Sequence, residues 1–227
     1  MQRSSALAIV VAVVALGCVY ARAEASPVTV QTVDMQGNNI PHVVILAPEN
    51  QLPADPDLNR EMPAAIMDQI DKAFAPEVLV IEQGRKVNFP NSDNIRHHVY
   101  SFSKPKVFEL KLYAKQPEHP IEFEQAGIVV LGCNIHDQML GFIVVSDTAT
   151  WAETDSNGLA TLPLPENLNT IRVWHPNLKS GFNQVEVHPL PKRQPDQVIR
   201  VQLDLKTTPP AKEKRGFGSD RFKLHGR

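Results

Sequence analysis

Short apolar segments separated by turn signals run through most of this chain. Residues 28–33 alternate apolar and polar side chains, residues 78–81 are a continuous apolar run, and Gly37 and Gly84 stand in the turns that follow them. A period of two, and short apolar runs bounded by turn residues, are typical of β-strands. About seven or eight such segments within residues 66–146 favour a β-sandwich. The predicted fold class is therefore all-β.

The same pattern continues on both sides of that region. Residues 66–74 also alternate, and Pro63 argues against a helix beginning near Glu61, so we expect an extended segment there. The other expected strands are 42–46, 86–89, 97–102, 108–112, 121–123, 128–131, 142–145, 159–164, 170–174, 184–188 and 198–205. Tight turns are expected at 34–39 and 154–158, where Asp, Asn and Gly gather.

One loop between two of these strands has a set of soft donor atoms. The run LGCNIHDQMLGFIVV contains Cys133, His136 and Met139, each three residues after the last. Thiolate, imidazole and thioether together favour copper over zinc. Two histidines, a cysteine and a weak axial methionine make the ligand set of a blue-copper electron-transfer site, so a second histidine is needed. The chain offers His97 or His98 upstream.

The N-terminus resembles a secretory signal peptide over residues 1–25. Arg3 supplies the positive charge, residues 6–15 are almost wholly apolar, and Ala23-Glu24-Ala25 resembles a cleavage site. A lipoprotein signal cleaved before Cys18 is the alternative. Both interpretations predict export, and we expect a periplasmic protein with no membrane span after signal removal.

Cys133 is then the single cysteine outside the predicted signal peptide. Cysteines in oxidising compartments usually pair, so a lone thiol there calls for another explanation. A buried thiol acting as a small apolar group is one possibility. The neighbouring His136 and Met139 favour the other, a metal ligand.

Charge is distributed unevenly along the chain. Residues 26–205 contain 22 acidic and 14 basic side chains, whereas residues 206–227 contain 2 acidic and 7 basic ones. The acidic body argues against nucleic acid as the main ligand. The basic tail has no apolar periodicity and is predicted to be disordered. Docking of this tail to an acidic partner or an anionic membrane surface is a hypothesis.

Three short motifs precede the cysteine loop in a fixed order. They are FAP at 74–76, NSD at 91–93 followed by HHV at 97–99, and FEQAG at 123–127. With these motifs, residues 64–148 resemble the cupredoxins, closest to the amicyanins and plastocyanins, and are similar to exported proteins labelled as methylamine-utilisation proteins. The resemblance implies a Greek-key β-sandwich that holds one type 1 copper ion.

The resemblance also assigns roles to the candidate ligands. His97 matches the upstream histidine, Cys133 the thiolate, His136 the second imidazole and Met139 the axial thioether. An asparagine often follows the upstream histidine in cupredoxins, and this chain has His98 there. His98 is therefore the alternative ligand, and we favour His97.

The segments around the cupredoxin-like region have a second pattern. Residues 26–50 resemble the first hairpin of a transthyretin-like module, as in carboxypeptidase regulatory domains, and residues 149–205 resemble its remainder. Residues 51–63 are rich in Pro and Asp and predict a linker. We expect the cupredoxin-like region to be inserted into this module, since insertion suits a domain whose ends lie close together. In the alternative, the first hairpin extends the cupredoxin sheet and the last strands form a separate sandwich.

These observations predict a periplasmic copper protein that passes single electrons between redox partners, such as a dehydrogenase and a c-type cytochrome. No nucleophile, general base or open coordination position is evident, so an enzyme is not expected. Two alternatives stay open. One is a protein that holds or delivers copper without redox partners, and the other is a binding module whose site has lost its metal.

Overall fold

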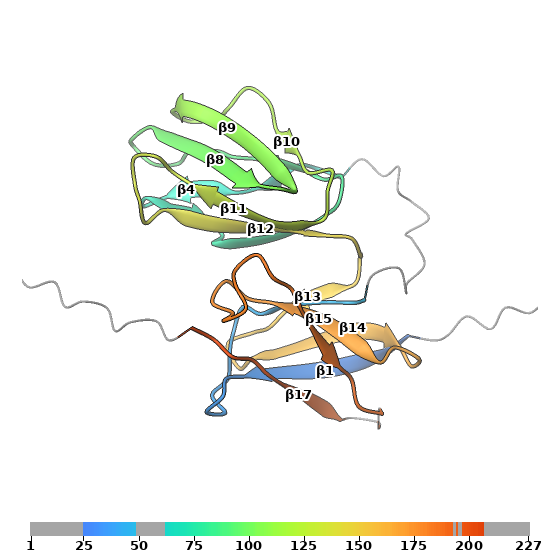
Figure 1. The fold of residues 1–227 in the computed structure, drawn as a ribbon. Coiled ribbons are helices and arrows are strands. Elements are labelled where there is room, and N and C mark those ends of the chain that lie inside the picture. The colour runs from blue at the N-terminus through green and yellow to red at the C-terminus, as the bar shows by residue number, and fades with distance from the viewer. Residues whose placement is uncertain (1–24, 49–61, 193, 195–196, 207–227) are drawn as a thin grey trace, which may run out of the picture.

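The computed structural model describes residues 25–48, 62–192, 194 and 197–206. These residues form strands β1 to β17 and contain no helix, so the predicted all-β class is confirmed (Figure 1). No described segment forms an apolar helix long enough to cross a membrane. The cysteine at 18 and nearly all of the predicted signal peptide, linker and basic tail lie outside the described residues.

The strands form two stacked units, which we call the central unit and the flanking unit (Figure 1). The central unit contains β3 (Ala65–Ile66), β4 (Asp68–Ile70), β5 (Ala73–Ala75), β6 (Val78–Glu82), β7 (Lys86–Asn88), β8 (His97–Ser103), β9 (Lys106–Tyr113), β10 (Ile121–Glu122), β11 (Gly127–Gly132) and β12 (Leu140–Ser146). Its large sheet has the order β6-β12-β11-β8-β9, and the smaller groups β10-β7-β3 and β4-β5 make the remaining layer.

An apolar cluster fills the central unit. It joins aromatic residues such as Phe89 and Phe123, which are fully buried, to inward-facing residues of the large sheet such as Ile143. Cys133 and Met139 belong to the same cluster and are 3% and 2% exposed. The cysteine loop is therefore part of the core at one end of the unit, where packing restricts its movement.

The flanking unit is built from both ends of the described chain. It contains β1 (Ala25–Val33), β2 (Val44–Leu46), β13 (Trp151–Glu153), β14 (Leu159–Pro165), β15 (Thr170–Trp174), β16 (Glu186–Pro189) and β17 (Val198–Gln202). One sheet has the order β14-β1-β17 and the other β13-β2-β15-β16. Strands that precede the central unit thus pair with strands that follow it. The transthyretin-like identity of this unit stays a prediction.

The expected hairpin within residues 26–50 is not formed. Strand β1 pairs with β14 and β17, whereas β2 pairs with β13 and β15, so the two strands lie in different sheets. The turn after β1 is present, with Gly37 at φ 88°. His42 then adopts a left-handed conformation at φ 60°, which turns the chain away before β2 begins.

The two units share a third apolar cluster. Strand β12 turns Ile143 and Val145 into the core of the central unit, while Phe142 and Val144 pack toward the flanking unit. The ring of Phe142 lies 5.4 Å, centroid to centroid, from that of Trp174 on β15. A strand buried on both faces reads as a continuous apolar run, which explains the sequence FIVV in β12.

Arg172 on β15 binds both chain segments that connect the units. Its Nε and one terminal nitrogen donate to the carbonyl oxygen of Ala47 at 2.9 and 2.8 Å, and its guanidinium is paired with the carboxylate of Asp147. Ala47 lies just before the chain leaves the flanking unit, and Asp147 lies where the chain returns. The arginine therefore fixes the two junctions next to each other.

Two further predictions about strands need correction, and one strand was missed. Residues 66–74 were expected to be one extended segment, but Asp71 and Lys72 turn it back into the β4-β5 hairpin. Strand β13 was not predicted at all. The last strand ends at Gln202 instead of 205, and Leu205 forms an isolated bridge with Leu178.

Candidate metal centre

Two elements of the large sheet bring the candidate ligands together. His97 is the first residue of β8, and Cys133 directly follows β11, which pairs with β8. His136 lies in the loop between β11 and β12. Cys133 and His97 are buried, and His136 is partly exposed. Neighbouring strands thus position two of these groups, and a short loop positions the third.

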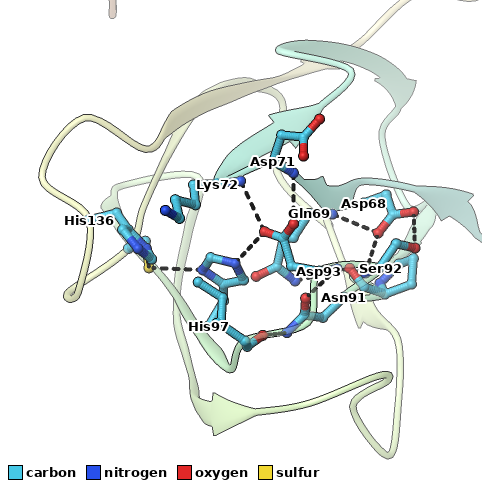
Figure 2. Close-up of polar contacts among 12 residues, drawn as sticks. Asp68, Gln69, Asp71, Lys72, Asn91, Ser92, Asp93, His97 and His136 are labelled. Carbon is cyan, nitrogen blue, oxygen red and sulfur yellow. Dashed lines mark hydrogen bonds and ion pairs between the residues drawn. The ribbon is translucent and has the colours of Figure 1, made fainter.

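The donor atoms of these three residues converge. The sulfur of Cys133 lies 3.7 Å from Nδ1 of His97 and 3.9 Å from Nδ1 of His136. All three donor atoms lie within 4.8 Å of one another. The two imidazole rings have centroids 5.1 Å apart and planes tilted by 49°. Figure 2 shows the ring of His97 between the sulfur, on one side, and the carboxylate of Asp93, on the other.

These distances fit ligands of one metal ion. Bonds of about 2.3 Å to sulfur and 2.05 Å to nitrogen, opened by 109–120°, place the two donor atoms roughly 3.6–3.8 Å apart. The observed sulfur-to-nitrogen distances are close to that range. The donor set, one thiol and two imidazoles, suits zinc and copper alike, and an added thioether selects copper.

Met139, the fourth predicted ligand, ends the same loop. Its side chain is buried in the cluster that contains Cys133. A turn holds it there, since its backbone N–H donates to the carbonyl of His136 at 2.9 Å. Met139 is thus fixed by the same turn that positions His136, and its role as an axial ligand stays a prediction.

His98, the alternative ligand, is directed away from the sulfur. Its Nε2 lies 2.8 Å from a carboxylate oxygen of Glu109 on β9, and its ring packs against Tyr100. Successive side chains of a strand point to opposite faces, so only one of two adjacent histidines can face Cys133. An irregularity in the pairing with β9 falls between His97 and Val99, as bulges often do beside functional sites.

Gly132 lets an aromatic ring pack beside the cysteine. A Cβ atom added to this glycine would lie 2.7 Å from the ring of Tyr100, too close for any real side chain. Tyr100 is the residue of β8 that pairs with Gly132. The ring of Tyr100 can therefore lie over residue 132 because that residue has no side chain, and a larger residue there would make the ring shift.

Asp93 contacts the far side of His97. Its Oδ2 lies 2.6 Å from Nε2 of His97 and also accepts the backbone N–H of Lys72 at 2.9 Å, while its Oδ1 accepts the N–H of Asp71 at 2.7 Å (Figure 2). Partial burial alone would raise the pKa of Asp93. The hydrogen bonds from Lys72, His97 and Asp71 outweigh burial and hold the pKa below its ordinary value. Asp93 is therefore a carboxylate at neutral pH.

Sequence reasoning did not assign a role to Asp93. It belongs to the NSD motif, which contributes only to the resemblance. The signal that could have found it is its position four residues before His97, since a carboxylate that close in sequence can reach the imidazole. The supporting hairpin turn at Asp71 and Lys72 has no glycine or asparagine to mark it.

A second buried polar cluster lies behind the site. The hydroxyl of Tyr113 donates to the carbonyl of Phe89 at 2.7 Å and accepts from the side chain of Gln69. Burial raises the pKa of Tyr113 to about 12, and the hydrogen bond from Gln69 opposes part of that shift. The phenol stays neutral at physiological pH and closes the core beside the donor atoms.

No model of a protein family matches the sequence, and no curated protein matches it. Solved structures do show similarity. A copper-containing nitrite reductase from Thermus scotoductus SA-01 is 26% identical over 43% of this chain, with a TM-score of 0.38, and the chain covers 28% of that enzyme. A reduced Cu(I) amicyanin variant is 21% identical over 37% of this chain and 82% of its own, with a TM-score of 0.34. A purple cupredoxin from Nitrosopumilus maritimus is 22% identical over 36% of this chain and 99% of its own, with a TM-score of 0.33.

Proposed function

We propose that this protein carries single electrons on one type 1 copper ion held by His97, Cys133 and His136, with Met139 as the axial ligand. The observation that supports the proposal best is the buried sulfur of Cys133, 3.7 and 3.9 Å from the two Nδ1 atoms. Copper bound by such a set cycles between Cu(II) and Cu(I), accepting one electron and passing it on.

The surroundings of these residues suit electron transfer. Cys133 and His97 are held by paired strands and by the packed core, so their positions need change little between oxidation states. The core also excludes water from the sulfur. A preorganised, dry environment lowers the cost of reorganisation when charge moves.

His136 provides the route to the surface. It is partly exposed, and the neighbouring Ile135 and Leu140 have 50% and 52% of their surface exposed. Such an apolar rim supports brief contacts with another redox protein, because small interfaces dissociate quickly. We propose a dehydrogenase or a c-type cytochrome as the partner, and the periplasm as the compartment.

The proposal is tested by adding Cu(II) to the purified protein and recording the visible spectrum. We expect an intense charge-transfer band from thiolate to copper, absent from Cys133→Ser. A colourless protein that binds Cu(I) tightly would support copper delivery instead. No copper binding at all would contradict both functions.

Two matched pairs of variants test the ligand assignment. His97→Ala should abolish the band, whereas His98→Ala, one residue along the same strand, should keep it. Met139→Leu should shift the band and the reduction potential, whereas Met67→Leu, at another fully buried methionine of the same cluster, should leave both unchanged. The reverse result in either pair would reassign that ligand.

A further inference from the structure

We propose that Asp93 is a positioning residue that fixes the tautomer of His97 and strengthens it as a copper ligand. The proposal builds on the copper site described above. The outer nitrogen of His97, Nε2, lies 2.6 Å from Oδ2 of Asp93, while the inner nitrogen, Nδ1, lies 3.7 Å from the sulfur of Cys133. One imidazole thus connects the carboxylate to the thiol (Figure 2).

The carboxylate is held rigidly by a two-residue turn. Asp71 and Lys72 both have left-handed backbone conformations, with φ of 51° and 61°, and their N–H groups donate to the two oxygens of Asp93. A non-glycine pair with positive φ is uncommon and indicates a conformation that the surroundings maintain. Here that conformation points two adjacent amides at a single side chain.

The backbone of Asp93 is fixed from the opposite side. Its N–H donates to the side-chain oxygen of Asn91 at 3.0 Å, and the side-chain amide of Asn91 donates to the carbonyls of Ile95 and Tyr113. Asn91 is itself 5% exposed. Both ends of Asp93 are therefore constrained, and the carboxylate cannot turn away from His97 without breaking several hydrogen bonds.

This arrangement determines which ring nitrogen has the proton. The two backbone N–H groups favour the ionised form of Asp93, and an ionised carboxylate can accept from Nε2 but cannot donate to it. His97 must then have its proton on Nε2, which leaves the lone pair of Nδ1 free on the side of Cys133. A histidine that donates its second N–H to a carboxylate is oriented and becomes more basic as a metal ligand.

The charge of Asp93 should also favour the higher oxidation state. A negative group bonded to a ligand stabilises Cu(II) more than Cu(I), because the attraction grows with the charge of the ion. The side chain of Asp93 is 11% exposed, so solvent screens this attraction only in part. Asp93 is thus expected to lower the reduction potential of the site.

The test compares Asp93→Asn with Asp68→Asn in the full-length protein. Asp68 lies on β4, in the hairpin whose turn binds Asp93, and it accepts the N–H of Gln69 at 2.7 Å and the hydroxyl of Ser92 at 2.7 Å. None of its hydrogen bonds within the described residues is to a histidine. Asp93→Asn should weaken Cu(II) binding about 10- to 100-fold. If Cu(I) binding is unchanged, the potential should rise by about 59 mV for each tenfold loss. Asp68→Asn should change neither quantity.

A measurement on the metal-free protein separates this proposal from the proposed function. Nitrogen NMR of His97 should show the Nε2–H tautomer in the parent protein and in Asp68→Asn, and a mixed or reversed tautomer in Asp93→Asn, since an amide can donate to Nε2. An unchanged tautomer in Asp93→Asn, or an unchanged potential, would overturn the proposal. Failure of the parent protein to bind copper would instead contradict the proposed function and leave the tautomer result intact.

Discussion

The central and flanking units are made of similar short strands, yet they bury different kinds of side chain. The core of the flanking unit consists of Val, Ile, Leu and Ala residues. Its buried polar residues include Thr32 and Thr154, whose hydroxyls both donate to the carbonyl of Ile40. The central unit also buries hydroxyls, those of Ser101 and Ser146, but it buries His97 beside the thiol of Cys133 as well.

The difference separates polar groups that complete a fold from polar groups that indicate a site. A threonine hydroxyl bonded to a carbonyl satisfies that acceptor and offers nothing further. A buried imidazole whose second nitrogen faces a thiol still has a lone pair with which it can bind a metal ion. Strand pattern alone does not distinguish the two units, but the chemistry of their buried polar groups does. Four predictions test this contrast.

The largest effect is expected from removing one leucine in each core. Leu162 in the flanking unit and Leu131 in the central unit are both fully buried, so each change to alanine should cost about 2–5 kcal/mol of unfolding free energy. Denaturant unfolding measures both. Leu131→Ala, two residues before Cys133, should also alter the copper spectrum, whereas Leu162→Ala should not. An altered spectrum in Leu162→Ala would show that the site depends on the flanking core.

Copper itself should stabilise one unit selectively. Copper at 100 times its dissociation constant should add about 2.7 kcal/mol to the stability of the state that binds it. Hydrogen exchange should slow in β8, β11 and β12 and stay unchanged in β1 and β14. Equal slowing in both units would mean that they unfold together and would remove the contrast between them.

Acid should weaken the flanking unit through His175. Burial, together with the nearby charge of His42, lowers the pKa of His175 to about 4. Between pH 6.5 and 4 the unfolded chain binds a proton that the folded chain does not, so stability falls as the pH falls through this window. Allowing for the exposed part of the ring, the loss is about 1–2 kcal/mol. The unfolding free energy of metal-free His175→Asn, measured across this pH range, should depend less on pH than that of the parent protein. An equal pH dependence would contradict the role given to His175.

The smallest effect concerns the junction between the units. Lysine cannot bind Ala47 and Asp147 together as the guanidinium of Arg172 does. Arg172→Lys should therefore lower the unfolding free energy by about 1 kcal/mol and speed hydrogen exchange near both residues. The control is Lys179→Met, which removes an exposed pair with Asp204 and should cost less than about 0.5 kcal/mol. Equal costs would show that Arg172 has no special role.

Local signals explain how much of the fold was predictable. Alternation located β1, a short apolar run located β11, and turn residues located the bend at Gly84. Pairing partners were harder, because β1 and β17 are joined by contacts between distant segments that no local pattern specifies. The shared cluster around Trp174 was also missed, although the apolar run of β12 was a signal of burial on both faces.

The candidate ligands were predictable where the residue type alone identified a metal-binding side chain. Cys133, His136 and Met139 share one loop, so their proximity follows from sequence. The choice of His97 over His98 depends on which face of β8 meets Cys133, and only the structure shows that. The interval of four residues brings Asp93 near His97, but the orientation of its carboxylate depends on a positive-φ turn in a different strand pair, which no sequence signal marks.

The pairing of β1 with β14 and β17 has a consequence for biosynthesis. Strand β1 precedes both of its partners by more than a hundred residues, so its two edges stay unpaired while the residues of the central unit follow it out of the ribosome or across a membrane. Until β14 and β17 arrive, these edges can pair with another chain, and a chaperone or rapid folding of the inserted sandwich would limit that exposure.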